Sequence, residues 1–270
     1  MSRPRYGAEP SPVTRWIILG VVGALFVVPI LALVEFSLRV GQTGQHSFVH
    51  YAAIFDPANA STYSVLFQGI GNSLVICAIT VLIVLLVLLP TMILVELAFP
   101  KYRRVLEFIC IIPITIPSIV LVVGFVPVYS VVASIFGSYP WTLAFAIGVI
   151  VLPYAYRPIA ANLAALDVVI LSEASRSLGA GWFSLIVKVL LPNLRRGIFS
   201  SCFITIAVVL GEFTIASFLS QNTFQTALLL LQHTDPYVAV IFALFALVFV
   251  FVLLILIGRL GTSRRNRRSA

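Results

Sequence analysis

Long uninterrupted runs of apolar residues occupy most of this chain, and polar residues gather in the connections between them. A helix needs about 20 residues to cross the roughly 30 Å hydrocarbon core of a bilayer, and six runs reach that length with no charged residue or one. The pattern therefore predicts an all-α integral membrane protein. The predicted spans are Trp16 to Leu38, Ser73 to Val95, Val105 to Tyr129, Tyr139 to Tyr156, Ile198 to Leu219 and Tyr237 to Leu260.

Composition supports the same class, because 61% of the 270 residues are hydrophobic and only 10% are charged. A soluble domain is closer to half apolar. The first span follows basic residues, as a signal peptide does, but its apolar stretch is longer than the roughly 7 to 15 residues of a cleavable one, so we expect it to be retained. We predict a single membrane domain over residues 16–260, with an N-terminal segment at 1–15 and a basic tail at 261–270.

The distribution of Lys and Arg predicts the topology. All of the 17 basic residues except Arg39 fall in the N-terminal segment, the second and fourth connections, or the tail. Cytoplasmic segments carry such an excess, so both termini are expected in the cytoplasm. The net charge of +8 then suits anionic lipid headgroups. The tail sequence RRNRR could bind nucleic acid, but the placement of the other basic residues favours lipid, and we expect no nucleic-acid partner.

Several kinds of chemistry have no matching pattern in the sequence. Neither Lys101 nor Lys188 ends a phosphate-binding G-x-x-x-x-G-K motif, and no spacing indicates a catalytic triad, so the chain is expected to hold no cofactor and to be no enzyme. His46 and His50 have a spacing that could place two imidazoles on one helical face, but without a third ligand we expect no metal. The cysteines show neither disulfide nor zinc spacing: Cys77, Cys110 and Cys202.

Two spans contain residues that interrupt their apolar character. Pro113, Pro117 and Pro127 remove backbone donors from the third span and are expected to kink it, either to line a path or only to pack. Glu212 places a carboxylate in the fifth span, where a charge is costly and normally faces a cavity or the protein interior. It is either part of a substrate path, together with Phe213, or a hydrogen-bonding link between helices.

The fourth connection contains a polar segment, EASRSLGAGWFSLIVKVLLP, which runs from Glu173 to Pro192. We expect Ser172 to cap a helix that begins at Glu173, and Gly179 to close it with a positive φ. A second short helix would start at Trp182, and Pro192 would end the segment before the fifth span. An apolar side on this second helix fits an amphipathic helix on the membrane surface equally well: Trp182, Phe183, Ile186 and Val187.

This segment resembles the EAA loop of permease subunits in ABC importers. The matching residues are Glu173, Ala174, Ser175, Gly179, Val189, Leu191 and Pro192, with Ser175 in place of the usual second alanine and Val189 in place of the usual isoleucine. The resemblance implies a type I importer permease in which a cytoplasmic coupling helix between spans four and five docks on a separate ATPase. The implied coupling residues are Glu173, Ala174, Ser175, Arg176, Gly179 and Pro192.

The resemblance also implies partners and a location. ATP and Mg²⁺ would bind in a dimer of ATPase subunits, and the chain would pair with a second, homologous permease subunit. An extracytoplasmic substrate-binding protein would deliver the substrate, and membrane lipid would surround the spans. The location implied is the bacterial cytoplasmic, or inner, membrane.

The substrate class is less sharply indicated by the sequence. The chain is similar to the second permease of polyamine importers in three features: the segment from Glu173 to Pro192, the sequence IIPITIPSIV upstream of it, and the acid at Glu212. A carboxylate at Glu212 would suit an organic cation. The GEF sequence at Glu212 also resembles permeases for ferric iron, oxyanions and phosphonates, and a sugar is a further alternative. From other classes, a secondary transporter should show inverted repeats, which we do not find, and a simple membrane anchor would not need the polar segment.

Overall fold

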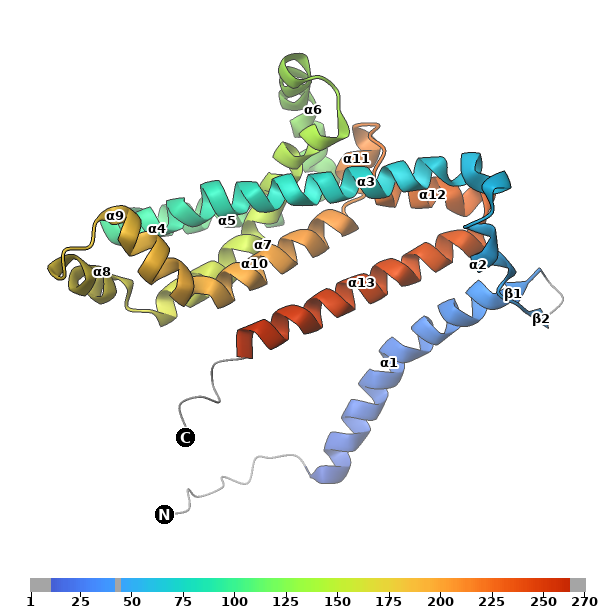
Figure 1. The fold of residues 1–270 in the computed structure, drawn as a ribbon, viewed down its shortest axis with the longest axis horizontal. Coiled ribbons are helices and arrows are strands. Elements are labelled where there is room, and N and C mark those ends of the chain that lie inside the picture. Colours follow the sequence, from blue (N-terminus) through green and yellow to red (C-terminus); the bar gives the residue numbers. More distant parts are fainter. Residues whose placement is uncertain (1–10, 42–44, 263–270) are drawn as a thin grey trace.

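The computed structural model describes residues 11–41 and 45–262, and nearly all of them are helical (Figure 1). Within these ranges six helical segments are long and apolar enough to cross a membrane: Pro12–Leu38, Pro57–Ala98, Ser118–Phe136, Pro140–Ala165, Trp182–Gly211 and Pro236–Leu256. The prediction of an all-α protein with six spans is therefore confirmed. Most of the predicted segments 1–15 and 261–270 lie outside the described residues.

The elements follow one another with short connections. The first half contains α1 (Pro12–Leu38), β1 (Arg39–Val40), β2 (Gln45–His46), α2 (Val49–Ala53), η1 (Pro57–Asn59), α3 (Ala60–Ile83), η2 (Val84–Leu88), α4 (Leu89–Ala98), η3 (Pro100–Tyr102), α5 (Arg103–Thr115) and α6 (Ser118–Phe136). The second half contains η4 (Pro140–Thr142), α7 (Leu143–Ala165), α8 (Val168–Ser177), α9 (Trp182–Ser184), η5 (Leu185–Leu190), α10 (Leu191–Gly211), α11 (Thr214–Phe218), α12 (Phe224–Thr234) and α13 (Pro236–Thr262). The strands β1 and β2 pair antiparallel, with Arg39 opposite His46.

The main core lies where α3, α7 and α10 pack together. Ile76, Ile147 and Leu194, one from each helix, are almost fully buried there. At Gly197 of α10 a Cβ atom would lie 2.7 Å from Asn162 Cβ and 2.8 Å from the Pro158 carbonyl oxygen of α7. Such close backbone contact between membrane helices requires a small residue, so Gly197 sets the distance between α7 and α10.

A second core joins α12 to α3 and α13, at the end of the molecule away from α8 (Figure 1). Gly69 of α3 allows this contact, because a Cβ there would lie only 2.6 Å from the Thr223 carbonyl oxygen. The Phe224 N–H, in the first turn of α12, donates to Ser73 Oγ at 2.9 Å. These contacts hold the short helix α12 across the two long helices.

The third predicted span differs from the structure. In place of one kinked helix over Val105 to Tyr129, two helices, α5 and α6, meet at a break. Ile116 is extended there, with φ −101° and ψ 126°, because the residue before a proline is disfavoured in helical conformation. Pro117 thus breaks the span, whereas Pro113 and Pro127 lie inside their helices.

Two helices contain a wide π turn directly before a proline. In η2 the Leu89 N–H donates to the Val84 carbonyl oxygen, and Pro90 follows. In η5 the Leu191 N–H donates to the Ile186 carbonyl oxygen, and Pro192 follows. A proline supplies no donor and its ring crowds the carbonyl four residues earlier, and the wider turn accommodates both effects.

Candidate functional site: an exposed helical loop and an opposite-end cavity

The loop between α7 and α10 is built around α8, which begins earlier than the sequence indicated. The predicted start at Glu173 and cap at Ser172 are both wrong. Asp167 is the N-cap, and its carboxylate accepts a hydrogen bond from the Ile170 N–H at 3.4 Å. Ser172 lies in the middle of the helix and is buried. The cap differs because residues 168–171, although apolar like the end of a span, form the first turn of α8.

The C-terminal end of α8 confirms the prediction for Gly179, whose φ is +81°. The Ala180 N–H donates to the Ser175 carbonyl oxygen at 3.0 Å, and the Gly179 N–H donates to the Arg176 carbonyl oxygen at 2.9 Å. This pair of bonds is the Schellman motif, which needs a residue in left-handed conformation just beyond the helix. The motif turns the chain sharply from α8 toward α9.

Pro192 does not end the segment, contrary to the prediction. The helix is continuous from Trp182 to Gly211, and Pro192 lies near the start of α10 behind the π turn of η5. The second helix of the loop is therefore the beginning of the fifth span itself. α9 and α10 thus belong to one helical segment.

One face of α8 is packed and the other is exposed. Val168 and Ser172, one turn apart, are buried in the part of α8 that packs against α4 and η5. Glu173 and Ala174, which point away from this packed side, are exposed, and so is Arg176, one turn beyond Ser172 at the C-terminal end of the helix. The same loop also exposes apolar side chains: Leu178 is 89% and Phe183 is 81% exposed. Trp182 is also exposed, and the Arg176 guanidinium lies 5.8 Å from the centre of its ring. Charged and apolar groups thus share one protruding surface.

Glu212 lies at a break in the fifth span. The predicted helix over Ile198 to Leu219 ends at Gly211, and Glu212 is extended, with φ −79° and ψ 111°. Its Oε1 accepts a hydrogen bond from the Ile215 N–H, in the first turn of α11, at 2.8 Å. A carboxylate is well placed near the positive end of a helix. The prediction of a carboxylate within a continuous helix is therefore wrong, and Glu212 positions α11.

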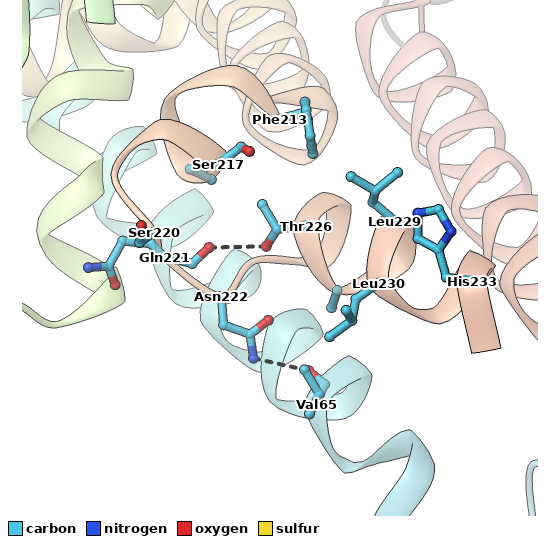
Figure 2. A pocket seen from close by; sticks show the side chains of 12 residues that line it. Val65, Phe213, Ser217, Ser220, Gln221, Asn222, Thr226, Leu229, Leu230 and His233 are labelled. Atoms are coloured by element: carbon cyan, nitrogen blue, oxygen red, sulfur yellow. Dashed lines mark hydrogen bonds between the residues drawn. The ribbon is translucent and has the colours of Figure 1, made fainter. Parts of the chain in front are cut away.

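Phe213, the neighbour of Glu212, lines a cavity of about 380 Å³ (Figure 2). The walls come from α3, α11, α12 and the connection between the last two, whereas Glu212 is absent from the lining. Six of the lining residues are used below: Val65, Phe213, Ser217, Asn222, Leu229 and Leu230. Sequence reasoning missed all of these except Phe213, because they belong to separate elements and no motif connects them.

Hydrogen bonds to the backbone of α3 and α11 shape this cavity. Asn222 Nδ2 donates to the Val65 carbonyl oxygen at 3.1 Å, and Asn72 Nδ2 donates to the Asn222 carbonyl oxygen at 2.8 Å. Ser220, with φ +52°, takes the left-handed position after α11. The Gln221 N–H donates to the Ala216 carbonyl oxygen at 2.9 Å. These bonds order the connection that faces the cavity.

The two histidines weighed as metal ligands have separate partners. His46 Nε2 lies 3.2 Å from Glu35 Oε1. His50 Nε2 lies 3.1 Å from the Arg39 carbonyl oxygen, and its ring stacks on Tyr237 with centroids 4.2 Å apart. Over the residues that the structure describes, no group of three or more His, Cys, Asp or Glu side chains could hold a metal ion.

Six apolar helices define a multi-pass membrane protein, and a loop with an exposed helix connects the fourth and fifth spans. Residues 93–267 match the family described as binding-protein-dependent transport system inner membrane component, and the chain belongs to this family. Its members are permease subunits of ABC importers with a type I fold, not enzymes. The loop over residues 173–192 lies inside the matched region.

The chain is also similar to the spermidine/putrescine transport system permease protein PotB of Haemophilus influenzae. The two sequences are 28% identical over 186 residues, which is 63% of this chain. The chain spans 62% of the length of that relative.

Proposed function

We propose that this chain is the permease subunit of an ATP-driven importer for polyamines or a similar small organic cation. In this proposal residues 16–260 form the permease domain, and residues 1–15 and 261–270 are cytoplasmic. The observation that carries the transport role is the protruding loop over residues 173–192 in a chain of this family. Both termini lie in the cytoplasm, and the membrane is the bacterial inner membrane.

The loop would couple ATP hydrolysis to the membrane helices. Two ATPase subunits bind ATP and Mg²⁺, and each permease places its α8 in a groove on one of them. Glu173 and Arg176 offer exposed charges for pairing, and Leu178 and Phe183 offer apolar contact area. Because α8 packs on α4 and η5, and α9 continues into α10, movement of the loop would tilt two spans together. The chain itself holds no cofactor.

Further partners follow from the same proposal. A second, homologous permease subunit would complete the path, and an extracytoplasmic binding protein would deliver the substrate. The apolar side chains of α1 are exposed over nearly its whole length, which suits lipid and a neighbouring membrane subunit.

The charges on the end of the molecule away from α8 favour a cationic substrate. Among the described residues at that end the only Lys or Arg is Arg39, which pairs with Glu35, whereas two further acids, Asp56 and Asp235, lie in connections there. An acidic entrance raises the local concentration of cations. The similarity to a spermidine/putrescine permease points the same way.

A solute panel tests the proposal on the complex reconstituted with its ATPase and binding protein. We expect spermidine or putrescine to stimulate ATP hydrolysis, and ferric iron, sulfate, phosphonate and maltose not to do so. Stimulation by one of the latter solutes alone would exclude the polyamine class. Absence of ATP-dependent uptake with every solute would exclude the importer role.

Glu212 provides a second test within the same assay. Glu212→Gln keeps an oxygen for the Ile215 N–H and should leave thermal stability in detergent unchanged, but it removes a negative charge and should weaken stimulation by a cation. Glu212→Leu also loses the cap and should lower stability. A Gln variant with normal stability and normal stimulation would remove the Glu212 charge from the transport path.

A further inference from the structure

The cavity beside α11 combines apolar walls with a small number of oxygen atoms. Val65, Leu229 and Leu230 provide aliphatic walls, and Phe213 adds an aromatic ring (Figure 2). Its volume of about 380 Å³ lies in the range of small-molecule sites, which runs from about 300 to 1,000 Å³. Neither Lys nor Arg lines it, so a cation meets no fixed positive charge on entry.

Polar side chains also line this cavity, and two of them offer acceptor oxygens: the set is Ser217, Ser220, Gln221, Asn222, Thr226 and His233. Asn222 uses its Nδ2 to donate to the Val65 carbonyl oxygen, and this bond fixes the amide so that Oδ1 turns from the wall toward the cavity (Figure 2). Ser217 Oγ, at the lining, has no hydrogen-bond partner among the described residues. The face of an aromatic ring such as Phe213 also attracts cations. Acceptors separated by apolar wall suit a molecule with ammonium groups on a methylene chain.

A second cavity shows the contrast. It has a volume of about 270 Å³ and is lined by Ile70, Leu210, Phe242, Phe245 and other apolar side chains. Its one hydroxyl, that of Ser73, already accepts the Phe224 N–H. It therefore offers an ammonium group only the one hydroxyl oxygen, which already accepts a hydrogen bond.

We propose that the cavity between α3, α11 and α12 is a transit site for an alkylammonium group of the substrate before it enters the path. The inference rests on the function proposed above. Because no carboxylate lines the cavity, its affinity for an ammonium group should be low. Low affinity suits a transit site, since such a site must release what it binds. Glu212 acts here as a positioning residue, because its cap holds α11 and so the Ser217 hydroxyl.

Charge placed at the cavity tests this inference. Leu230 lines the cavity and is 58% exposed, so a charged side chain can be accommodated there without burial. Gln232 is exposed on the same helix outside the lining and serves as the control position. In the reconstituted complex Leu230→Lys should raise the half-saturating polyamine concentration by roughly threefold to tenfold at low salt, and Leu230→Glu should lower it. Ser217→Ala should raise it several-fold.

The controls separate the possible outcomes. Gln232→Lys and Gln232→Glu should change that concentration little, and the concentration of binding protein needed should stay constant in all variants. Leu230 variants that match the Gln232 variants, or that change only the need for binding protein, would overturn the transit site and leave the proposed function standing. A wild-type complex that no polyamine stimulates would overturn both.

Discussion

Gly179 offers the sharpest test of how the loop over residues 173–192, which we propose couples to the ATPase, is built. Its φ of +81° is a conformation that costs a residue with a side chain about 1 to 2 kcal/mol. A Cβ there would meet nothing within 4 Å, so steric contact within the chain adds no further cost. Gly179→Ala should therefore lower the population of the closed Schellman motif by about 5-fold to 30-fold. Asn, which tolerates this conformation better, should cost less, and Val should cost more.

Gly181 is the matched control in the same loop. A Cβ at Gly181 also meets nothing within 4 Å, but its φ is −73°, which alanine adopts freely. The assay is uptake per ATP hydrolysed by the reconstituted complex, together with the affinity of the ATPase for the permease. We expect Gly179→Ala to lower both and Gly181→Ala to lower neither. Equal behaviour of the two variants would refute the claim that the backbone geometry at Gly179 positions the docking surface.

Two further predictions concern packing and topology. Gly69→Ala should lower the melting temperature in detergent, because its Cβ would lie 2.6 Å from the Thr223 carbonyl oxygen and α12 would have to shift, at a cost of about 1 to 3 kcal/mol. Gly71→Ala is the control, since a Cβ there meets nothing within 4 Å and should leave the melting temperature unchanged. Equal melting temperatures of the two variants would contradict this packing. Cysteines introduced at Leu178 and Phe55, which are 89% and 85% exposed, should react with impermeant reagents from opposite sides of the membrane, Phe55 from outside; labelling of both from one side would contradict the topology.

The sequence alone determined that the chain has six membrane-spanning helices, although not the bounds of the third and fifth, and it also determined one local turn. Lipid offers no partner for backbone N–H and C=O groups, so an apolar run of sufficient length must be helical whatever it packs against. The turn at Gly179 was also readable, since a glycine after a polar helical stretch commonly takes a positive φ. Both predictions depend on interactions within a few residues of the chain. The sidedness inferred from Lys and Arg stays a prediction.

Tertiary packing decided where the helices begin and end. Residues 168–171 are as apolar as a span, and only the contact of α8 with α4 and η5 shows that they belong to this helix, with Asp167 as its cap. Likewise Glu212 is surrounded by apolar residues in sequence, but the helix ends at Gly211 and the carboxylate caps α11. The helix propensity of a short stretch of sequence could not locate the start of α8 or the end of α10, because both depend on contacts with residues distant in the sequence.

The cavity depended entirely on the tertiary structure. It forms because α12 lies across α3 where Gly69 leaves room, which brings the Val65 carbonyl oxygen within hydrogen-bonding distance of Asn222. No periodicity or motif connects these positions, since hydrophobic patterning records only whether a residue is buried and not which neighbour buries it. The sequence thus determined that the chain crosses the membrane, and the packing of short helices against long ones decided where a substrate could be held.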